Sequence, residues 1–500
     1  MKRAKIVATF GPSLSTYEQT TDAIKAGVNI ARLNLSHGSH EVHEKVYANI
    51  RRASDALRTP VGILVDLQGP KIRLGKIAAG PQDLAVGDVI TITTEDAPGD
   101  KDIVSTTFAG LAKDVSAGDK LLIDDGRVVL RALESDGIRV RAEVLVAGRI
   151  SDNKGINLPG VPVDVPALSE KDEEDLRWAL HLGADIIALS FVRSADDIQR
   201  VHEIMDEEDR RLPVVAKIEK PQAVDNLKSI IDAFDGIMVA RGDLGVELPL
   251  EEVPLVQKRA IEHARRWAKP VIVATQVLES MIENPIPTRA EASDCANAIL
   301  DGADAVMLSG ETSVGKYAIE TVQTMARIIE AAERKGLKRI PPLGTKPRTQ
   351  GGAMTLAALE VSSFVDAKAL IVFTESGDSA RRMSRLRPSL PVYGFTPSPE
   401  IECRMQMIWG INTRLVDRVD HTDDMVAQVD DILIGERIAA KGDKVVVVSG
   451  MPPGIPGSTN DIRVHTVGDV HDEAAPAYHG KRRIEILHTG SVDLPGMRDA

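Results

Sequence analysis

The chain has 500 residues, of which 43% are hydrophobic and 27% charged, and its formal net charge is −13. A single hydrophobic core stops growing at roughly 250–300 residues, so two or three domains are expected. The negative charge and the 3% content of aromatic residues argue against a nucleic-acid-binding protein, which needs clustered cations and stacking rings. Any phosphate chemistry must therefore depend on local positive sites.

The cysteine content and the lack of long apolar runs indicate the compartment. The two cysteines, Cys295 and Cys403, cannot form a disulfide framework and are typical of a reducing environment. Gly11-Pro12 interrupts the N-terminus before a signal-peptide core develops. No apolar run approaches the ~20 residues of a membrane-spanning helix. We expect a cytoplasmic protein without a membrane or nucleic-acid partner.

Short apolar runs alternate with amphipathic helical segments through the first two thirds of the chain. The runs are continuous, which indicates strands covered on both faces, and most recur at the spacing of one βα unit. Eight such units predict a (β/α)8 barrel, whose active site lies at the carboxyl ends of its strands. The eight predicted strands are 5–10, 30–35, 61–67, 184–191, 213–218, 236–240, 270–275 and 303–308.

Two further units interrupt or follow this alternation. Residues 71–166 carry Gly-Asp and Asp-Gly turns between Val, Ile and Thr runs, which predicts a small antiparallel β domain inserted in a barrel loop. We expect it to act as a lid over the active-site face. The barrel is thus assigned to 1–70 and 167–340, a second α/β domain to 345–475, and a loosely held tail to 476–500.

Two carboxylates and a lysine follow neighbouring predicted strands. Lys217 and Glu219 end the fifth strand, and Asp243 follows the sixth. Mg²⁺ prefers one or two carboxylates plus substrate oxygens and water, and the Lys217 ammonium adds a compact positive charge. Polar residues are common where strands meet loops, but cations and carboxylates placed to converge favour a site for a small, highly anionic substrate.

These residues lie in motifs that resemble the pyruvate kinase family, and the resemblance covers roughly 1–475. The matching segments are 30–38, 217–219, 238–245, 274–276, 287–291 and 307–312. The resemblance implies transfer of the phosphoryl group of phosphoenolpyruvate to ADP, which gives ATP and pyruvate in glycolysis. It also implies a homotetramer.

The resemblance assigns roles to individual residues. Glu219 and Asp243 would bind Mg²⁺, for which Mn²⁺ can substitute, and Lys217 would stabilise the charge that develops during transfer. Arg32, assisted by Arg73, would clamp the phosphoryl group. The substrate would also contact Gly242, Asp243 and Thr275, and Thr275 would help to protonate the enolate through water. The implied nucleotide contacts are Pro12, Asn34, His37 and Lys154.

One position departs from many pyruvate kinases, which have an acidic residue where Lys71 stands and need K⁺ near the phosphoryl site. Family members with a lysine there supply the positive charge themselves. The resemblance therefore implies that this enzyme works without K⁺. The positions that would have ligated K⁺ are Asn34, Ser36, Asp66 and Leu67.

A strand-to-helix junction in the second α/β domain is a candidate effector site. Hydroxyls and backbone N–H groups at a helix start make a phosphate cradle, although an ordinary capped helix start fits the residues equally well. Family members bind a sugar bisphosphate, a sugar monophosphate or AMP there. Arg381 and Arg382 favour an anion, Glu375 and Asp378 oppose one, and the loop 451–457 is placed to close over the site. The candidate residues are Thr374, Ser376, Gly377 and Ser379.

Other interpretations stay open at this stage. A Mg²⁺-dependent aldolase or lyase on the same barrel also needs two carboxylates and an arginine, but needs neither the lid nor Lys217. A phosphometabolite sensor without activity needs the second domain alone. His37, His40 and His43 repeat at helical spacing, and we expect solvated histidines there, since no cysteine accompanies them.

Overall fold

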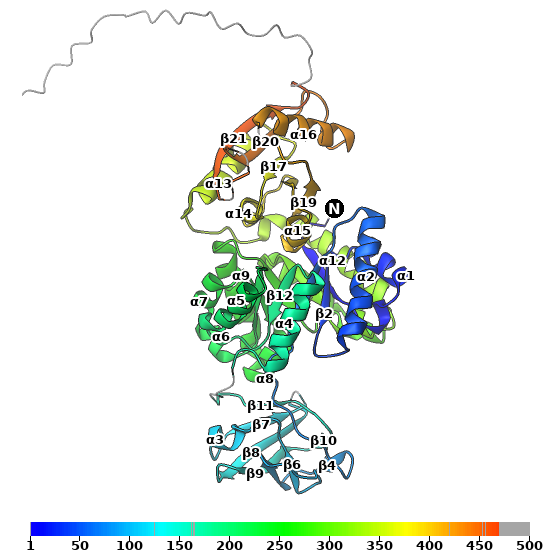
Figure 1. The fold of residues 1–500 in the computed structure, drawn as a ribbon, viewed down its shortest axis with the longest axis vertical. Coiled ribbons are helices and arrows are strands. Elements are labelled where there is room, and N and C mark those ends of the chain that lie inside the picture. Colours follow the sequence, from blue (N-terminus) through cyan, green and yellow to red (C-terminus); the bar gives the residue numbers. More distant parts are fainter. Residues whose placement is uncertain are drawn as a thin grey trace, which may run out of the picture.

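The computed structural model describes residues 2–469, except Asp125, Pro162, Asp164, Val165, Asp420, Pro453 and Pro456. The predicted tail, 476–500, lies outside the described residues. The elements form three bodies along the long axis of the molecule, with the β-rich insert at one end, the barrel in the middle and the C-terminal α/β domain at the other end (Figure 1).

The central body is a closed barrel of eight parallel strands, as predicted. All eight predicted strands are confirmed within two residues at each end. Continuous Val, Ile, Leu and Ala runs form these strands because both of their faces are buried. In chain order they are β1 (Lys5–Thr9), β2 (Ile30–Asn34), β3 (Gly62–Asp66), β12 (Ile186–Leu189), β13 (Val214–Ile218), β14 (Gly236–Ala240), β15 (Val271–Ala274) and β16 (Ala305–Leu308).

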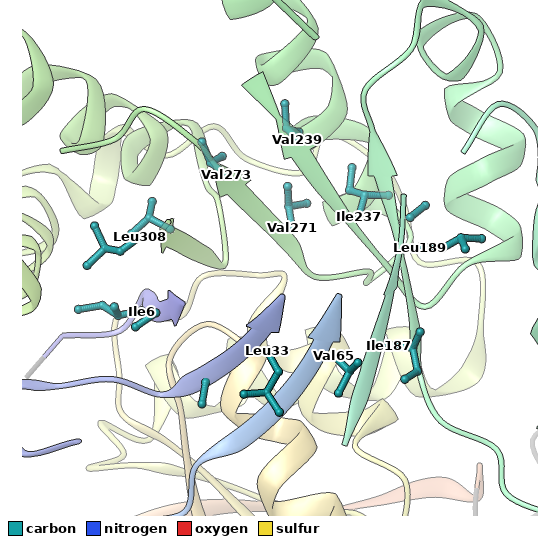
Figure 2. Close-up of a cluster of buried hydrophobic side chains, with 14 of the residues drawn as sticks. Ile6, Leu33, Val65, Ile187, Leu189, Ile237, Val239, Val271, Val273 and Leu308 are labelled. Carbon is teal, nitrogen blue, oxygen red and sulfur yellow. The ribbon is translucent and has the colours of Figure 1, made fainter. Parts of the chain in front are cut away.

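Alternate side chains of the barrel strands enter two separate hydrophobic layers. Ile6, Leu33 and Ile237 belong to the layer that the strands share with the surrounding helices (Figure 2). Leu64 and Met238 belong to the layer that fills the barrel interior. Met407 of the C-terminal domain joins this interior layer, so the second domain closes one end of the barrel.

The barrel helices begin where the sequence supplies caps. The side chains of Thr16, Ser169 and Thr288 each accept a hydrogen bond from the backbone N–H of the third helical residue. The side chain of that third residue in turn accepts a hydrogen bond from the backbone N–H of the capping residue. The helices of the barrel body are α1 (Tyr17–Ala26), α2 (His40–Leu57), α4 (Glu170–Leu182), α5 (Ile198–Glu207), α6 (Pro221–Asp225), α7 (Leu227–Ala233), α8 (Arg241–Glu247), α9 (Val253–Arg266), α10 (Arg289–Asp301), α11 (Gly310–Ser313) and α12 (Ala318–Gly336).

The insert contains a six-stranded sheet, a two-stranded sheet and the short helix α3 (Leu111–Asp114), with a core of its own. The prediction of a purely antiparallel domain was wrong for one pair, because β5 and β6 run parallel. The connection 94–102 returns the chain along the sheet before β6 begins. In sheet order the strands are β11 (Ile156–Asn157), β7 (Lys120–Ile123), β8 (Val128–Ser135), β9 (Arg139–Val146), β5 (Val89–Thr93) and β6 (Ile103–Ser105), with β10 (Gly148–Ile150) paired to β4 (Gln82–Leu84).

The C-terminal domain is a five-stranded sheet with helices, as predicted. Two of its strands were missed. Both lie at sheet edges, and because many of their residues are only partly buried or exposed, they lack the continuous apolar run that marked the others. In sheet order the strands are β19 (Ile411–Leu415), β18 (Val392–Thr396), β17 (Leu370–Phe373), β20 (Lys444–Gly450) and β21 (Thr459–Thr466), and the helices are α13 (Gln350–Phe364), α14 (Asp378–Ser384), α15 (Pro399–Arg404) and α16 (Thr422–Gly435).

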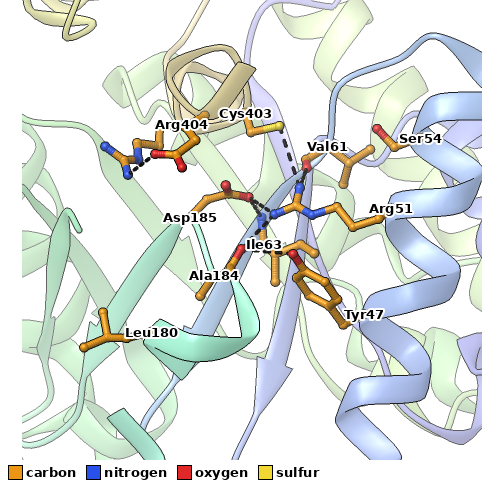
Figure 3. Close-up of polar contacts among 12 residues, drawn as sticks. Tyr47, Arg51, Ser54, Val61, Ile63, Leu180, Ala184, Asp185, Cys403 and Arg404 are labelled. Carbon is orange, nitrogen blue, oxygen red and sulfur yellow. Dashed lines mark hydrogen bonds and ion pairs between the residues drawn. The ribbon is translucent and has the colours of Figure 1, made fainter. Parts of the chain in front are cut away.

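Ion pairs and hydrogen bonds join the amino ends of the barrel strands to the C-terminal domain. Arg51 of α2 pairs with Asp185 at 2.8 Å and also donates to Cys403 Sγ at 3.7 Å (Figure 3). Asp304, which precedes β16, pairs with the buried Arg387 at 3.1 Å. The insert contacts the opposite face, where Asn157 donates to Glu247 of α8 at 3.1 Å. The carboxyl ends of the strands therefore face the insert.

Replacing Asp304 with asparagine is expected to lower the melting temperature strongly. Its carboxylate also accepts bonds from the backbone N–H groups of Val271 and Trp409, at 3.0 and 3.3 Å. Without it, the Arg387 guanidinium stays buried without its carboxylate, which costs about 3–5 kcal/mol. Scanning calorimetry measures the change. The matched control is Glu283→Gln, since Glu283 forms an exposed pair with Lys316 that should contribute less than about 1 kcal/mol.

Candidate active site

A chain of buried charges crosses the carboxyl end of the barrel, with Asp66 at its centre. Arg32 donates from Nε to Asp66 Oδ2 at 2.7 Å and from Nη1 to Thr9 Oγ1 at 2.9 Å, and its Nη2 lies 2.7 Å from Asp66 Oδ2 as an ion pair. The other oxygen of Asp66 lies 3.3 Å from Lys217 Nζ. Three neighbouring strand ends, those of β1, β2 and β3, thus hold one guanidinium in a fixed orientation.

Lys217 extends this chain to Glu219. Its ammonium lies 2.9 Å from Glu219 Oε1 and donates to Ser190 Oγ at 2.7 Å. Ser190 in turn donates to the Leu67 carbonyl at 2.7 Å. Glu219 Oε2 accepts the backbone N–H of Phe191 at 2.7 Å. Lys217 and Glu219 are therefore fixed by contacts that come from the ends of β3 and β12.

The charges in this cluster shift one another's pKa values. Burial alone would raise the pKa of Asp66, but Lys217 and Arg32 outweigh it and lower that pKa below its ordinary value. Burial alone would lower the pKa of Lys217, but Asp66 and Glu219 raise it above its ordinary value. Asp66 is therefore ionised and Lys217 protonated at neutral pH.

Glu219 and Asp243 form the carboxylate part of the site. Burial, together with the nearby negative charge of Asp243, raises the pKa of Glu219, although Lys217 opposes the shift. Burial is the largest cause of this shift, and the negative charge of Asp243 adds to it. A divalent cation bound by these hard oxygens would stabilise their ionised forms. Within the described part of the chain, no three His, Cys, Asp or Glu side chains gather into a metal site.

Thr275 lies in a strained turn at the end of β15. Thr275 and Gln276 have φ angles of 66° and 53°, in the left-handed region that such residues rarely adopt. The Thr275 hydroxyl accepts the Gly242 N–H at 2.6 Å and donates to the Ala274 carbonyl at 2.7 Å. Arg241 stabilises the turn through the Thr275 carbonyl at 2.9 Å and pairs with Asp294 at 2.7 Å. Arg241 thus positions Thr275 from outside the cluster.

Three predicted site residues lie in or beside the insert. The Arg73 guanidinium donates to the Asn153 carbonyl at 3.0 Å, and Lys154 pairs with Asp124 at 2.9 Å. The Lys71 side chain lies against Gly155 and lines a cavity between insert and barrel. None of the three is joined to Asp66 by an ion pair in the described residues. In this conformation they are outside the Arg32–Asp66–Lys217 cluster.

Three of the four predicted nucleotide residues, Pro12, Asn34 and His37, lie at or just after the ends of β1 and β2, whereas Lys154 belongs to the insert. Pro12 begins a short 3-10 helix, and Asn34 Oδ1 accepts the Ser36 N–H at 3.2 Å. The expectation of solvated histidines was wrong for His43, which is buried and donates to the His37 carbonyl at 2.8 Å. His40 stacks on Trp178 and pairs with Asp175, so the repeat at helical spacing serves packing, not metal binding.

Sequence reasoning missed one residue of the site. Ser190 orients Lys217 by accepting a hydrogen bond from its ammonium at 2.7 Å. Ser190 lies near the carboxyl end of the predicted strand 184–191 and directly follows β12 in the structure, and that position was the available signal. A serine at a strand end is too common to single out without its contacts.

Comparison with known proteins identifies the family. The family model described as "Pyruvate kinase, barrel domain" matches residues 1–322, and "Pyruvate kinase, alpha/beta domain" matches residues 352–465. The chain belongs to the pyruvate kinase family. It is therefore a phosphotransferase of glycolysis, and the family's substrates and products are phosphoenolpyruvate, ADP, ATP and pyruvate. The family also implies a divalent metal cofactor.

Relatives match over nearly the whole chain. The pyruvate kinase of Mycobacterium tuberculosis strain H37Rv is 54% identical over 468 residues, covering 94% of this chain and 99% of the relative. The pyruvate kinase of Corynebacterium glutamicum is also 54% identical, and the match covers 94% of this chain and 98% of the relative. The crystal structure of a pyruvate kinase from Cryptosporidium parvum has a TM-score of 0.86 at 35% identity and covers 93% and 96% of the two chains.

The predicted effector residues surround a cavity in the C-terminal domain. Thr374, Ser376 and Ser379 line it, whereas the Gly377 N–H is bonded to Thr374 Oγ1 at 2.9 Å. Arg381 and Arg382 pair with Asp378 instead of lining the cavity. The lining arginine is Arg418, which pairs with Glu375 at 3.0 Å and was missed. The predicted closing loop contributes Gly454, Ile455 and Gly457, and its Pro453 and Pro456 lie outside the described residues.

In residues 2–469, apart from the undescribed positions, no helix is both long and apolar enough to cross a bilayer.

Proposed function

We propose that this pyruvate kinase family member transfers the phosphoryl group of phosphoenolpyruvate to ADP at the carboxyl ends of its barrel strands. The observation that carries the proposal is the buried chain of Arg32, Asp66, Lys217 and Glu219. Phosphoryl transfer mainly requires positioning and neutralisation of charge on the moving group, and fixed cations in a site shielded from water supply both.

Arg32 would bind the transferred group with the N–H groups that Asp66 and Thr9 leave free. A guanidinium has five N–H donors, and two of those of Arg32 make hydrogen bonds to Asp66 and Thr9. All three donors of Lys217 have protein acceptors. We infer that a substrate oxygen replaces one of these acceptors of Lys217. The hydrogen bond to Ser190 is the one lost at the lowest free-energy cost, because Ser190 is the uncharged acceptor. Arg73 would join when the insert moves toward the barrel.

Glu219 and Asp243 would hold Mg²⁺, with Mn²⁺ as a substitute. The bound ion would supply positive charge to the oxygens of the substrate. The Thr275 hydroxyl is too weak an acid to protonate the enolate alone. Its bonds to Gly242 and Ala274 hold it in one orientation, which suits it to order a water that delivers the proton. Pro12, Asn34, His37 and Lys154 are the proposed nucleotide contacts.

A coupled assay for pyruvate tests this proposal. Pyruvate should form only when Mg²⁺, ADP and phosphoenolpyruvate are all present, with one ATP formed per pyruvate. Release of pyruvate without ADP would favour a lyase. Binding of phosphoenolpyruvate without turnover under any of these conditions would favour a sensor. Either result would overturn the assignment.

We also propose that a phosphorylated metabolite regulates the enzyme through the cavity lined by Thr374, Ser376 and Ser379. Arg418 supplies the positive charge that Arg381 and Arg382 do not, because both of these pair with Asp378. The buried hydroxyls of Thr374 and Ser379 beside the largely exposed Arg418 suit a phosphate, which would compete with Glu375 for Arg418.

Arg418→Ala is expected to raise the effector concentration for half-maximal activation at least about tenfold, as loss of one charge-assisted contact predicts. The measurement is the phosphoenolpyruvate saturation curve with a sugar bisphosphate, a sugar monophosphate or AMP. Arg463→Ala is the matched control, because Arg463 lies on β21 of the same domain outside this cavity. An unchanged response in Arg418→Ala would contradict the assignment.

We further propose a cytoplasmic homotetramer, as the family resemblance implies. Sedimentation equilibrium of the full chain should give about four times the monomer mass of 53.9 kDa. A monomer at working concentrations would contradict this proposal.

A further inference from the structure

A second polar cavity lies where the barrel, the linker and the C-terminal domain meet. It encloses about 430 Å³. Its walls carry Arg266, Lys269, Lys346, Arg348, Arg382 and Arg385, and its only carboxylate among the described residues is Asp232. The cavity is separate from both the barrel mouth and the cavity lined by Ser379.

Most of the positive charge in this cavity lacks a compensating carboxylate. Arg266 pairs with Glu262 and Arg382 with Asp378. Asp232 accepts a bond from Trp267 Nε1 at 3.0 Å. Over the residues that the structure describes, no carboxylate lies within ion-pair distance of the remaining four cations, which are Lys269, Lys346, Arg348 and Arg385.

The adjoining interior is also positively charged. Arg265 and Arg387 are only 4% and 8% exposed, and among the described residues Asp304 is the one carboxylate lining the small cavity that they share with Lys269 and Arg385. The Nε atoms of Arg265, Arg385 and Arg387 are buried without a hydrogen-bond partner. Burial and the charge of Arg387 lower the pKa of Arg265 to about 10. Such mutual repulsion costs stability unless an anion offsets it.

We propose that this cavity binds a small molecule bearing phosphate groups. Arginine forks match the oxygens of phosphate, and the volume exceeds that of a single inorganic anion. Three separate segments supply the cations. Lys269 follows α9 of the barrel, Lys346 and Arg348 lie in the linker, and Arg385 follows α14. The ligand therefore joins the barrel to the C-terminal domain, and its binding stabilises their contact.

Two neighbouring features favour a phosphate ester or anhydride over a carboxylate. Thr349, on the cavity wall, caps α13, whose first turn contains Gly351 and Gly352, so a helix start with little side-chain bulk faces the cationic walls. Arg348 lies 4.7 Å from the centroid of the Trp267 ring, which orders the exposed linker guanidinium. Several strong donors arranged around one volume suit a ligand with several acceptor oxygens.

The test uses the full chain and titration calorimetry with two probes, inorganic pyrophosphate and a hexose bisphosphate. The variant Lys346→Ser/Arg348→Ser removes two exposed linker cations. Its control is Lys338→Ser/Arg339→Ser, which removes the same charge from an exposed 3-10 helix of the same connection. Binding at the barrel mouth and at the Arg418 cavity is unaffected by either change.

We expect one binding event that weakens at least about tenfold in the first variant, persists in the control and in Arg418→Ala, and weakens with added salt. Preference for pyrophosphate would identify an inorganic ligand, and preference for the bisphosphate a metabolite. The proposal is overturned if the first variant and the wild type give the same number of events and affinities. It is also overturned if the weakened event disappears in Arg418→Ala, since the event would then belong to the other cavity.

Discussion

Lys217→Met is expected to lower kcat by about 10²–10³-fold, which corresponds to the loss of one fixed cation that stabilises charge during transfer. The reason is the position of the ammonium, 3.3 Å from Asp66 and 2.9 Å from Glu219, inside the proposed phosphoryl site. The coupled pyruvate assay under saturating Mg²⁺, ADP and phosphoenolpyruvate measures the change. Near-normal turnover would contradict the assignment of Lys217.

The same substitution should also lower the melting temperature, because Asp66 and Glu219 stay buried without one of their cations. Scanning calorimetry separates this effect from the change in kcat. Lys316→Met is the matched control, since Lys316 pairs with Glu283 in an exposed position. Asp66 and Glu219 raise the pKa of Lys217 above its ordinary value of 10.5. The stability that Lys217 contributes is therefore complete below pH 10.5 and is lost only as the pH rises through its higher folded-state pKa.

We propose that the wild-type enzyme works without K⁺, and Lys71→Glu is then expected to make it depend on K⁺. In buffer free of K⁺ and NH₄⁺, we expect full activity of the wild type and a loss of about 10²-fold in the variant, since one positive charge near the phosphoryl group is gone. Added K⁺ should restore much of the variant's activity. The measurement is the initial rate across a K⁺ titration at constant ionic strength.

The expected effect of Lys71→Glu requires the insert to move. Lys71 lies against Gly155 in the present conformation and forms no ion pair with Asp66, so closure of the insert has to bring its ammonium to the substrate. Lys76→Glu, an exposed position of the same insert, is the control and should leave the K⁺ response unchanged. Strict activation of the wild type by K⁺ would refute the proposal.

Much of the fold was predictable because its signals are local. The run 236–240 is apolar at every position, and a strand that is buried on both faces requires apolar residues at successive positions. Thr288 and Glu291 mark a helix start through bonds that span three residues. Edge strands such as β19 were missed because part of their surface faces solvent, so they lack the continuous apolar run of a strand buried on both faces.

The sequence by itself determined the barrel, the inserted β domain, the second α/β domain and the convergence of Lys217, Glu219 and Asp243. It did so because hydrophobic periodicity and strand order follow from neighbouring residues. Only the tertiary structure decided that Asp66 lies between Arg32 and Lys217, that Arg418 rather than Arg382 faces the effector cavity, and that four cations share a second cavity. Contacts of this kind join residues that are distant in the chain, and a side chain's partner is set by packing, which no local pattern encodes.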